Sequence, residues 1–326
     1  MAEIAVIVVN YGSADLAIDA VSSVLERQHG DHMVHLHLVD NASPGADRDI
    51  LQAAMARPGW AGHVTFYPED TNHGFGRGNN VVIDRLIARP NAPDYVFLLN
   101  PDARLANETL AVLADFLNAC PDAGVAGARI RKPGNVPVTA AFRFPGWIST
   151  FAAALSFGPV SRLTQRWQVA LSPDLATGQV DWVAGAAVML RLSALRTVGS
   201  FDPAYFLYYE EVDLMRRLGR SGWQTWYVAE AEAIHVEGAS TGVKSGEHVR
   251  RRRPAYWYES WRIYFINNHG RAHALLACLG WMLGATLNLP LARLRGKTPA
   301  APQRFFHDFW AMAVRPILGL AAKPYG

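Results

Sequence analysis

Asp102 stands where an apolar stretch of the sequence stops abruptly. The run YVFLL (95–99) precedes it, followed by Asn100 and Pro101. A short apolar run rich in β-branched and aromatic residues is typical of a buried strand, and Pro101 ends such a strand because proline has no N–H for the ladder. A carboxylate held there is a hard oxygen ligand, suited to Mg²⁺ or Mn²⁺ carrying phosphates. A helix cap is the alternative role for Asp102.

A second acidic group, Glu210-Glu211-Val212-Asp213, follows the aromatic run FLYY (206–209). We expect a helix over 214–220, so this group would lie at a helix amino terminus, where the helix dipole stabilises negative charge. Capping needs only one acid, however, and there are three here. A carboxylate among aromatic side chains can have a raised pKa and act as a general base. The cluster therefore indicates a general base, with capping as the alternative.

Two further strand ends carry polar side chains. Asp40 follows the predicted strand 35–39, and His235 ends a closing strand near 233–236. A single histidine is most often a core residue, but at the end of a strand of the same sheet it is a reasonable further metal ligand. We expect Asp102, Glu211 and His235 to converge on one pocket at the edge of the sheet.

The elements that position these side chains alternate along the chain. Strands are predicted at 4–9, 35–39, 64–67, 95–99, 125–131, 180–190 and 224–228, with helices at about 14–28, 47–57, 80–89 and 107–119. Such alternation implies parallel strands, right-handed crossovers and a sheet covered on both faces. Ligands of such sheets bind at the carboxyl ends of the strands. The stretch 142–171 has no firm period and is expected to be a loop region on the acceptor side or an ordinary insertion.

The glycine-rich segment TNHGFGRGNN (71–80) is not a dinucleotide fingerprint. Only Gly12 follows the first strand, and the glycines of 71–80 follow the third strand with the wrong spacing, so we exclude NAD binding. These glycines either let the backbone approach a ligand or open a helix, and a purely structural turn is the alternative.

Size and composition favour one large α/β domain with an appendage. The chain has 326 residues, half of them apolar, which excludes disorder. Cys120 and Cys278 are the only cysteines, so neither a disulfide framework nor a zinc site is indicated and a reducing compartment fits. The amino terminus has neither a basic leader nor a cleavage site, which predicts exposure to the cytosol.

The net charge of +3 hides a division of the chain. Residues 1–240 carry 18 Lys and Arg against 25 Asp and Glu, whereas residues 241–326 carry 13 against 3. A cationic segment beside apolar residues favours an anionic membrane surface or a phosphate-bearing acceptor. The acidic main body and the lack of a binding motif argue against nucleic acid. We expect two domains, 1–240 and 241–326.

The basic tail combines Arg250–Arg253 with aromatic residues at 256–264, a mixture typical of headgroup depth. The stretch 274–292 is uncharged, close to the roughly 20 residues that a bilayer span needs. Three alternatives stay open: an interfacial or re-entrant anchor, a helix packed on the catalytic domain or on a second subunit, and a true span. Another amphipathic helix is predicted at 305–320.

Seven motifs together resemble family 2 glycosyltransferases, in particular their rhamnosyltransferase-like branch, over about residues 1–240. In order they are VVNY (8–11), VDNAS (39–43), TNHGFGRGNN (71–80), LLNPDARL (98–105), DWVAGAAVMLR (181–191), FLYYEEVDLMRRL (206–218) and His235. The resemblance implies an α/β fold of the GT-A type, with a Rossmann-like nucleotide-binding sheet, plus the helical basic extension. It also implies a dTDP- or UDP-sugar donor, Mg²⁺ or Mn²⁺, and an inverting single displacement.

The resemblance also implies roles for single residues. On the donor side, Asp40 would recognise the pyrimidine base, and Asn10 and Tyr11 would line the nucleotide pocket. Framing of the donor is implied for Asn72, Gly74 and Asn79, and Asn100 is also placed on the donor side. Asp181, Trp182 and Gly185 would face the donor sugar and the acceptor, Asp102 would bind the metal with His235 assisting, and Glu211 would activate the acceptor. The family usually has E-D-x-D where this chain has Glu210-Glu211-Val212-Asp213, so Asp213 stays a rival base. The metal motif is Asn-Pro-Asp instead of D-x-D. It therefore offers one metal ligand fewer, so the diphosphate oxygens and His235 would have to contribute more of the metal's ligands.

The predicted function is a metal-dependent, non-processive glycosyltransferase of cell-surface polysaccharide synthesis, because the Q-x-x-R-W signature and multiple spans of the processive synthases are absent. The branch suggests rhamnose from dTDP-rhamnose as donor and a saccharide or polyprenyl-diphosphate-linked acceptor. We expect a cytoplasmic protein, peripheral on the inner face of the plasma membrane, with a homo-oligomer through the C-terminal helices as one option. Alternatives are an inactive fold that binds nucleotide or acceptor as an assembly module, and a sugar-phosphate nucleotidyltransferase, which would need a basic glycine-rich loop after the first strand.

Overall fold

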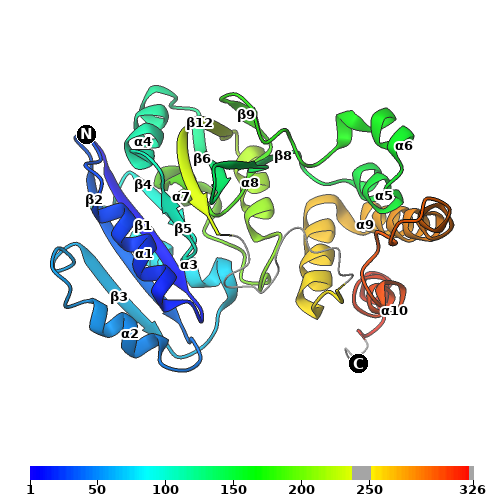
Figure 1. The fold of residues 1–326 in the computed structure, drawn as a ribbon, viewed down its shortest axis with the longest axis horizontal. Helices are drawn as coiled ribbons and strands as arrows, with labels where there is room; N and C mark the ends of the chain where they lie inside the picture. The colour runs from blue at the N-terminus through cyan, green and yellow to red at the C-terminus, as the bar shows by residue number, and fades with distance from the viewer. Residues whose placement is uncertain (237–250, 323–326) are drawn as a thin grey trace. The chain divides into compact units, whose positions relative to one another are not determined.

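A computed structural model describes residues 1–236 and 251–322 (Figure 1). The chain divides into two compact units. Unit 1 consists of Met1–Phe142, Ala170–Pro203 and the described part of Leu214–Ser245, and unit 2 of Arg143–Val169, Ala204–Asp213 and the described part of Gly246–Gly326. The domain boundary predicted at 240/241 lies outside the described residues.

Unit 1 is built on one large mixed sheet. Its main path runs in the order β3-β2-β1-β4-β11-β6-β12-β5. These strands are β1 (Glu3–Asn10), β2 (Met33–Asn41), β3 (Val64–Glu69), β4 (Tyr95–Leu99), β5 (Ala103–Leu105), β6 (Ala123–Lys132), β11 (Ala187–Arg191) and β12 (Gln224–His235). At the margins β7 (Val136–Val138) pairs with β6 and β9 (Gly178–Val180) with β12, while β8 (Ala141–Phe142) and β10 (Trp182–Val183) form a separate pair.

Helices cover the sheet, as the alternating pattern predicts. They are α1 (Ala14–Leu25), α2 (Asp47–Ala54), α3 (Gly74–Ile87), α4 (Thr109–Ala119), α7 (Leu192–Val198) and α8 (Glu210–Arg220), whose first four residues belong to unit 2. α3 packs on β1 and β2, and α4 packs on β6 and β12. Every residue of β4 is buried, which places this strand in the middle of the core and explains its continuous apolar sequence.

The predicted parallel pairing holds for only part of this sheet, because β5, β7, β9 and β11 pair antiparallel with their neighbours. β1 is parallel to β2 and β4, but β11 is antiparallel to both of its neighbours, β4 and β6. The regular alternation ends after β6, where the chain forms short strands, leaves unit 1, returns to it at Ala170 and forms β9 and β10 before β11. Parallel pairing requires a crossover connection, whereas an antiparallel strand accepts other connections, so the pattern of the first half does not extend to β11.

Three predicted elements differ in extent. The single strand predicted at 180–190 is divided among β9, β10 and β11, and the two closing strands are one strand, β12, with a register shift between Val228 and Glu232. The helix predicted from 214 begins at Glu210. The loop region predicted for 142–171 contains α5 (Trp147–Leu155), α6 (Gly158–Leu163) and the short η1 (Gln165–Trp167). α5 is short and mostly apolar, so its sequence shows no clear alternation of apolar and polar faces.

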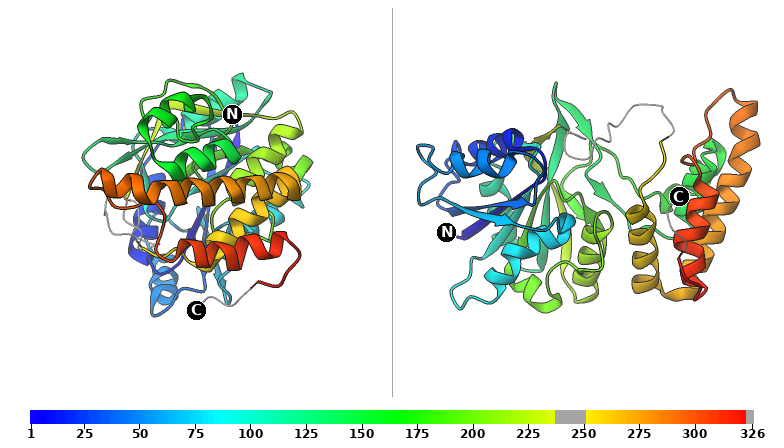
Figure 2. Two further views of the ribbon diagram at one scale, coloured as in Figure 1. Left: turned by 90° about the vertical axis from the view of Figure 1, so that its right-hand side faces the viewer. Right: turned by 90° about the horizontal axis from the view of Figure 1, so that it is seen from below.

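Unit 2 is helical and is organised around α9 (Ala255–Leu294). Gly270 interrupts α9 with φ 79° and ψ 165°, a conformation that glycine adopts at little cost, and divides it into two halves. The second half lies beside α5 and beside the segment formed by α10 (Phe305–Phe309), η2 (Trp310–Val314) and α11 (Arg315–Ile317) (Figure 2). In the described part of the chain, α9 is also the one helix long and apolar enough to cross a bilayer by length and composition.

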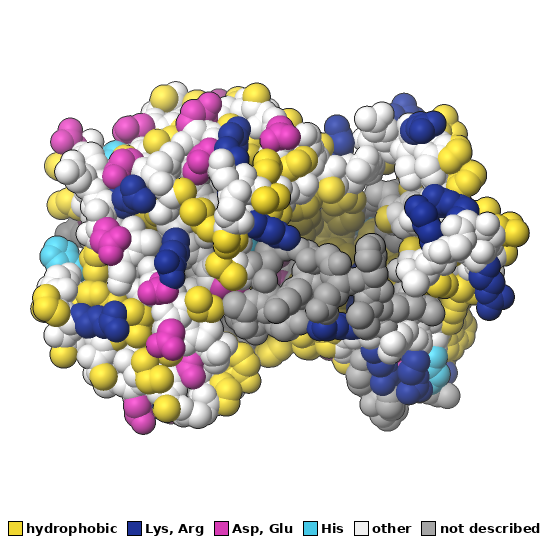
Figure 3. Space-filling view, viewed as in Figure 1, with side chains coloured by type: hydrophobic (Ala, Val, Ile, Leu, Met, Phe, Trp, Pro, Cys, Tyr) yellow, Lys and Arg dark blue, Asp and Glu magenta, His cyan; other side chains and the backbone are white. Residues whose placement is uncertain are grey.

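Aromatic side chains and one ion pair hold unit 2 together. Trp261 and Trp281, from the two halves of α9, both contact the ring of Phe309. Arg252 binds the fully buried carboxylate of Asp308 through two nitrogens, at 2.7 and 2.8 Å. Charge follows the division into units: on the face shown in Figure 3, Asp and Glu lie mostly on unit 1, whereas unit 2 shows mainly Lys and Arg.

Candidate active site

The carboxyl ends of β1 and β2 are joined by a hydrogen-bond network centred on Asn10. Its Nδ2 lies 3.0 Å from Ser43 Oγ, 3.3 Å from Asp47 Oδ1 and 3.4 Å from Asp40 Oδ1. Asp40 is fully buried, and its second oxygen lies 3.4 Å from Arg48 Nε. The position predicted to recognise the base is therefore a fixed, paired carboxylate, while Tyr11, the residue after Asn10, is exposed.

Asn41 and Asn72 close the turn that leads into α3. Asn41 Oδ1 accepts the His73 N–H at 2.9 Å, and its Nδ2 donates to Gly74 O at 3.0 Å. Asn72 Oδ1 accepts the Gly74 N–H at 2.9 Å. Gly74 has φ +74°, where a side chain would be strained, and opens α3. The segment 71–80 is thus a polar turn and a helix start, and Asn79 is buried within that helix and bonds to Phe75 O.

Asn100, Asp102 and His235 meet beside the carboxyl ends of β4 and β12. Asp102 is 4% exposed, and its Oδ1 lies 2.9 Å from His235 Nε2. Asn100 Nδ2 lies 3.4 Å from the same ring nitrogen. His235 pairs with Ala103 across the β5–β12 ladder, and its neighbour Val236 donates its N–H to Asp102 O. Sheet pairing therefore brings Asp102 and His235 together, and their role as metal ligands stays a prediction.

This cluster fits a hard divalent cation. Asn100 Oδ1 is buried and has no hydrogen-bond partner among the described residues. Asp102 Oδ1 and His235 Nε2 lie 2.9 Å apart, and a carboxylate oxygen and an imidazole nitrogen are both ligand types that divalent cations such as Mn²⁺ would accept. The described residues contain no group of three His, Cys, Asp or Glu side chains that could hold a metal. Remaining ligands would therefore come from Asn100, water or a ligand's phosphates.

Trp182 and Gly185 form a second, apolar part of the candidate site. The indole of Trp182 stacks on Phe142, with ring centroids 4.0 Å apart and planes 13° apart. A Cβ at Gly185 would lie 3.1 Å from the ring of Phe75, so a larger residue would displace that ring at the start of α3. Asp181 donates its N–H to Phe142 O and continues the β8–β10 pair. These contacts place the three predicted residues on one short strand and its following turn.

The three carboxylates at the start of α8 differ in their hydrogen bonds. Asp213 Oδ1 accepts from Asn268 Nδ2 at 2.7 Å and lies 3.3 Å from Tyr205 Oη. Glu210 Oε2 and Glu211 Oε2 are buried and have no partner among the described residues. Burial raises the pKa of Glu211, and burial together with the charge of Glu211 raises the pKa of Glu210 well above its ordinary value.

Two consecutive tyrosines precede these carboxylates in a strained conformation. Tyr208 and Tyr209 have φ of 72° and 71°, a region that bulky residues rarely occupy. Unit 2 holds them by ring contacts: Tyr208 stacks on Tyr256, and Tyr209 contacts Trp257. Ser260 Oγ fixes the same segment by donating to Leu207 O at 3.0 Å. Residues held in strained conformations by their surroundings are common at functional sites, and the catalytic role of this segment stays a prediction.

The structure brings the predicted residues together in groups. Asn10 and Asp40 share one network, and Asn100, Asp102 and His235 share another, all in unit 1. Glu211 and Asp213 belong to unit 2, so the predicted convergence of Glu211 with Asp102 stays a prediction. Sequence reasoning missed two residues: Asn41, which holds the turn before α3, and Arg48, which binds the carboxylate of Asp40. Asn41 directly follows a strand-end aspartate, and that position was the available signal.

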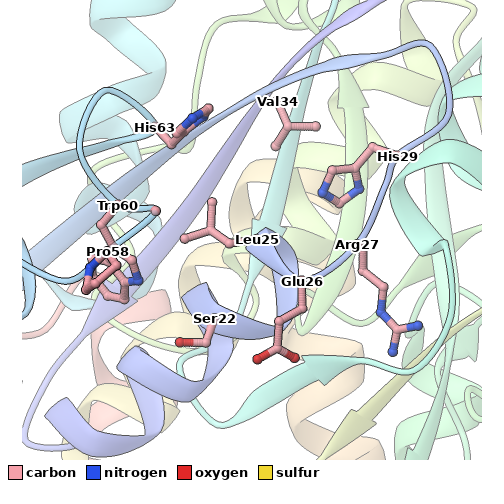
Figure 4. Close-up of a pocket in the computed structure, with 10 residues that line it drawn as sticks. Ser22, Leu25, Glu26, Arg27, His29, Val34, Pro58, Trp60 and His63 are labelled. Atoms are coloured by element: carbon pink, nitrogen blue, oxygen red, sulfur yellow. The ribbon is translucent and has the colours of Figure 1, made fainter.

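A cavity of unit 1 lies elsewhere, by the end of α1 (Figure 4). It has a volume of about 580 Å³ and is lined by Leu25, Glu26, Arg27, His29, Trp60 and His63, among others. Val34, at the start of β2, also lines it. The cavity is therefore at the amino end of the strands, opposite the candidate site, and it contains none of the predicted site residues.

Comparisons with known proteins agree with this geometry. The family model described as "Glycosyltransferase like family 2" matches residues 2–259. The chain is 31% identical over 265 residues, 78% of this chain and 81% of the relative, to N-acetylglucosaminyl-diphospho-decaprenol L-rhamnosyltransferase of Mycobacterium tuberculosis. It is 27% identical to Rhamnosyltransferase WbbL of Escherichia coli, over half of this chain and 61% of that protein.

A similar solved structure is a mannosyltransferase of Pyrobaculum calidifontis in complex with GDP-Man and Mn²⁺. The TM-score is 0.56 at 16% identity, and the match covers 97% of this chain and 82% of that one. At this identity the likeness concerns the fold, and it confirms the predicted GT-A architecture. Sheet, strand-end residues and family model lead to the same result: the chain belongs to the family 2 glycosyltransferases, in their rhamnosyltransferase-like branch.

Proposed function

We propose that this protein transfers L-rhamnose from dTDP-rhamnose, with inversion, to a polyprenyl-diphosphate-linked saccharide at the cytoplasmic face of the membrane. The donor sugar and the acceptor follow from the names of the relatives: two are rhamnosyltransferases, and one of these acts on a diphospho-decaprenol substrate. The observation that carries the proposal is the cluster of Asn100, Asp102 and His235 at the strand ends.

In this proposal, the cluster binds the diphosphate end of the donor. Asp102 supplies a negative oxygen, His235 a ring nitrogen and Asn100 a carbonyl oxygen that has no other partner among the described residues. A divalent cation bound here supplies positive charge against the negative charge that develops on the leaving diphosphate. Asp40 and Tyr11 then recognise the nucleotide base, and Trp182 limits the space for the sugar.

Glu211 is the proposed general base. Its carboxylate takes the proton of the acceptor hydroxyl while that oxygen forms a bond to the anomeric carbon. The bond between the anomeric carbon and the diphosphate oxygen breaks on the opposite side, and the nucleoside diphosphate leaves with the bonding electron pair. A buried carboxylate with a raised pKa suits this role because it is a stronger base than an exposed one. Asp213 is the weaker candidate because Asn268 already binds it.

A transfer assay with separated donors and metals tests the proposal. Purified protein is incubated with dTDP-rhamnose, UDP-sugars or GDP-sugars, with Mg²⁺, Mn²⁺ or EDTA, and with a short-chain polyprenyl-diphosphate-linked N-acetylglucosamine. We expect a rhamnosylated lipid product with the dTDP donor, dependence on the metal, and an inverted anomeric configuration by NMR. Binding of nucleotide without product or donor hydrolysis would favour the alternative, an inactive assembly module. Product from a different donor would show that the proposed donor sugar is wrong and that the protein is still a glycosyltransferase.

A further inference from the structure

Four leucines of the second half of α9 form an exposed apolar face. Leu276, Leu279, Leu283 and Leu287 are 51, 64, 55 and 43% exposed. Their spacing of three, four and four residues places them on one side of the helix. We call these four residues the leucine stripe. An exposed row of large aliphatic side chains is unusual on a soluble protein and marks a contact surface.

The opposite face of this helix is fixed by packing. A Cβ at Gly284 would lie 2.6 Å from Phe151 O, and one at Gly280 would lie 3.2 Å from Trp147 O, so both glycines let α5 approach the backbone of α9. Asn288 Nδ2 donates to Leu155 O at 2.9 Å, and its Oδ1 accepts the Ala300 N–H at 2.8 Å. The helix therefore cannot rotate to bury the leucine stripe without breaking these contacts.

Charge indicates which surface covers the stripe. There is no Lys, Arg, Asp or Glu between Arg271 and Arg293, and both of these arginines are exposed at the two ends. Residues 251–322 contain ten Lys and Arg against two Asp and Glu. An apolar face bounded by cations complements the apolar interior and the anionic headgroups of a bilayer.

The same unit is unsuited to crossing the bilayer. Only one face of the second half of α9 is apolar and exposed, because α5 and the α10–α11 segment cover the rest. The neighbouring segment contains the buried ion pair between Arg252 and Asp308, whose carboxylate would be costly in hydrocarbon. An orientation along the membrane surface exposes the stripe to lipid and keeps the charged residues in water.

We propose that the leucine stripe docks this protein on an anionic bilayer, with α9 lying in the membrane surface and Arg271 and Arg293 at headgroup level. The inference deepens the proposed function, since it names the surface on which a lipid-linked acceptor would be met. It does not depend on the identity of the sugar.

Vesicle sedimentation of the full-length protein tests the proposal. Vesicles of phosphatidylcholine are compared with vesicles that also contain phosphatidylglycerol. The variant Leu276→Gln/Leu279→Gln/Leu283→Gln/Leu287→Gln keeps good helix formers on the stripe. The control variant Met33→Gln/Ile50→Gln/Val136→Gln changes three exposed apolar residues of unit 1. If the fourfold variant does not fold, Leu279→Gln alone, at the most exposed position of the stripe, replaces it.

We expect the wild type and the control to bind the anionic vesicles, and the affinity of the stripe variant for them to be lower by about tenfold or more. Carbonate should release the bound protein. Equal binding of the stripe variant, or equal binding to neutral vesicles, would overturn the proposal. Release only by detergent would indicate a span instead, and a dimer in solution that the stripe substitutions dissociate would assign the surface to a second copy.

Transfer to a water-soluble, short-chain acceptor without vesicles separates this inference from the proposed function. The stripe variant should keep wild-type turnover in that assay and lose it only with a long-chain acceptor in vesicles. If the wild type binds vesicles but transfers no sugar in either assay, the membrane-docking role of the leucine stripe would be supported and the proposed reaction refuted.

Discussion

Asp102 Oδ1 lies 2.9 Å from His235 Nε2, although 133 residues separate them in the sequence. The turn after β4 carries the first and the end of β12 carries the second, and the ladder between β5 and β12 sets their distance. Two distant parts of the chain thus supply a carboxylate and an imidazole to one point. Such a pair has a clear consequence for the dependence on metal.

Asp102→Asn should lower kcat by about 10²-fold or more, because the amide keeps the shape of the carboxylate but removes its charge. His235→Gln should mainly raise the Mn²⁺ concentration needed for half-maximal rate, by roughly 10-fold or more. Both follow from rate measurements across a Mn²⁺ titration. His63→Gln, on the far side of the sheet, is the control and should behave like the wild type. Full turnover of Asp102→Asn in EDTA would remove this cluster from the mechanism.

Glu211→Gln and Asp213→Asn separate the two candidate bases. Loss of a general base typically costs about 10²–10⁴-fold in rate, so Glu211→Gln should lower kcat by that factor and leave the Kd of the donor unchanged in calorimetry. Asp213→Asn should instead lower the free energy of unfolding by about 1–3 kcal/mol, because it disturbs the bonds from Asn268 and Tyr205. The opposite assignment of kcat and stability would make Asp213 the base.

The raised pKa of Glu211 predicts a characteristic pH–rate profile. Only the ionised carboxylate accepts a proton, so kcat/KM should increase with pH through a midpoint above the ordinary glutamate value of about 4.3. A midpoint at or below that ordinary value would contradict this role. In Glu211→Gln the ascending limb should disappear from the residual rate.

Glu210 gives a pH effect on stability. Burial, and then the charge of Glu211, raises the pKa of Glu210. Between the unfolded value and this raised value the folded state holds more protons, so the free energy of unfolding should decrease as pH increases. Glu210→Gln should reduce that decrease and stabilise the protein at pH 7 by on the order of 1 kcal/mol. Urea unfolding at pH 5, 6, 7 and 8 measures the free energy of unfolding at each pH. The control Glu26→Gln, at an exposed position, should leave the dependence of that free energy on pH unchanged.

Gly284→Ala tests the packing of α9 on α5. The new methyl group would lie 2.6 Å from Phe151 O and 2.9 Å from Ala154 Cβ, so we expect a loss of about 1–3 kcal/mol in the free energy of unfolding. Gly219→Ala is the matched control, because it lies in α8 with nothing within 4 Å of the added Cβ. That substitution should be neutral or stabilising. Equal effects of the two substitutions would show that α5 and α9 do not pack this closely in solution.

Strand ends were the part of the site that could be predicted from sequence. Asn10 and Asp102 come after continuous apolar runs and Asp40 after the alternating run HLHLV (35–39), and parallel strands place such residues at one sheet edge. The antiparallel direction of β11 was not predictable, since strand direction leaves no mark on local periodicity. The helix α5 was not predicted, because its apolar residues pack on α9, about 130 residues later in the chain, and local periodicity does not record such a contact. The bond from Asn268 to Asp213 depends on the same kind of long-range contact.

The position of His235 in the last strand also has a consequence for synthesis of the protein. A nascent chain that ends before β12 already contains Asn10, Asp40 and Asp102, but β5 and β6 lack the strand that lies between them, and Asp102 lacks its imidazole. The carboxylate and the imidazole of the proposed cation site therefore come together late, once nearly three quarters of the polypeptide has been synthesised. Fragments truncated upstream of this strand would lack this pair.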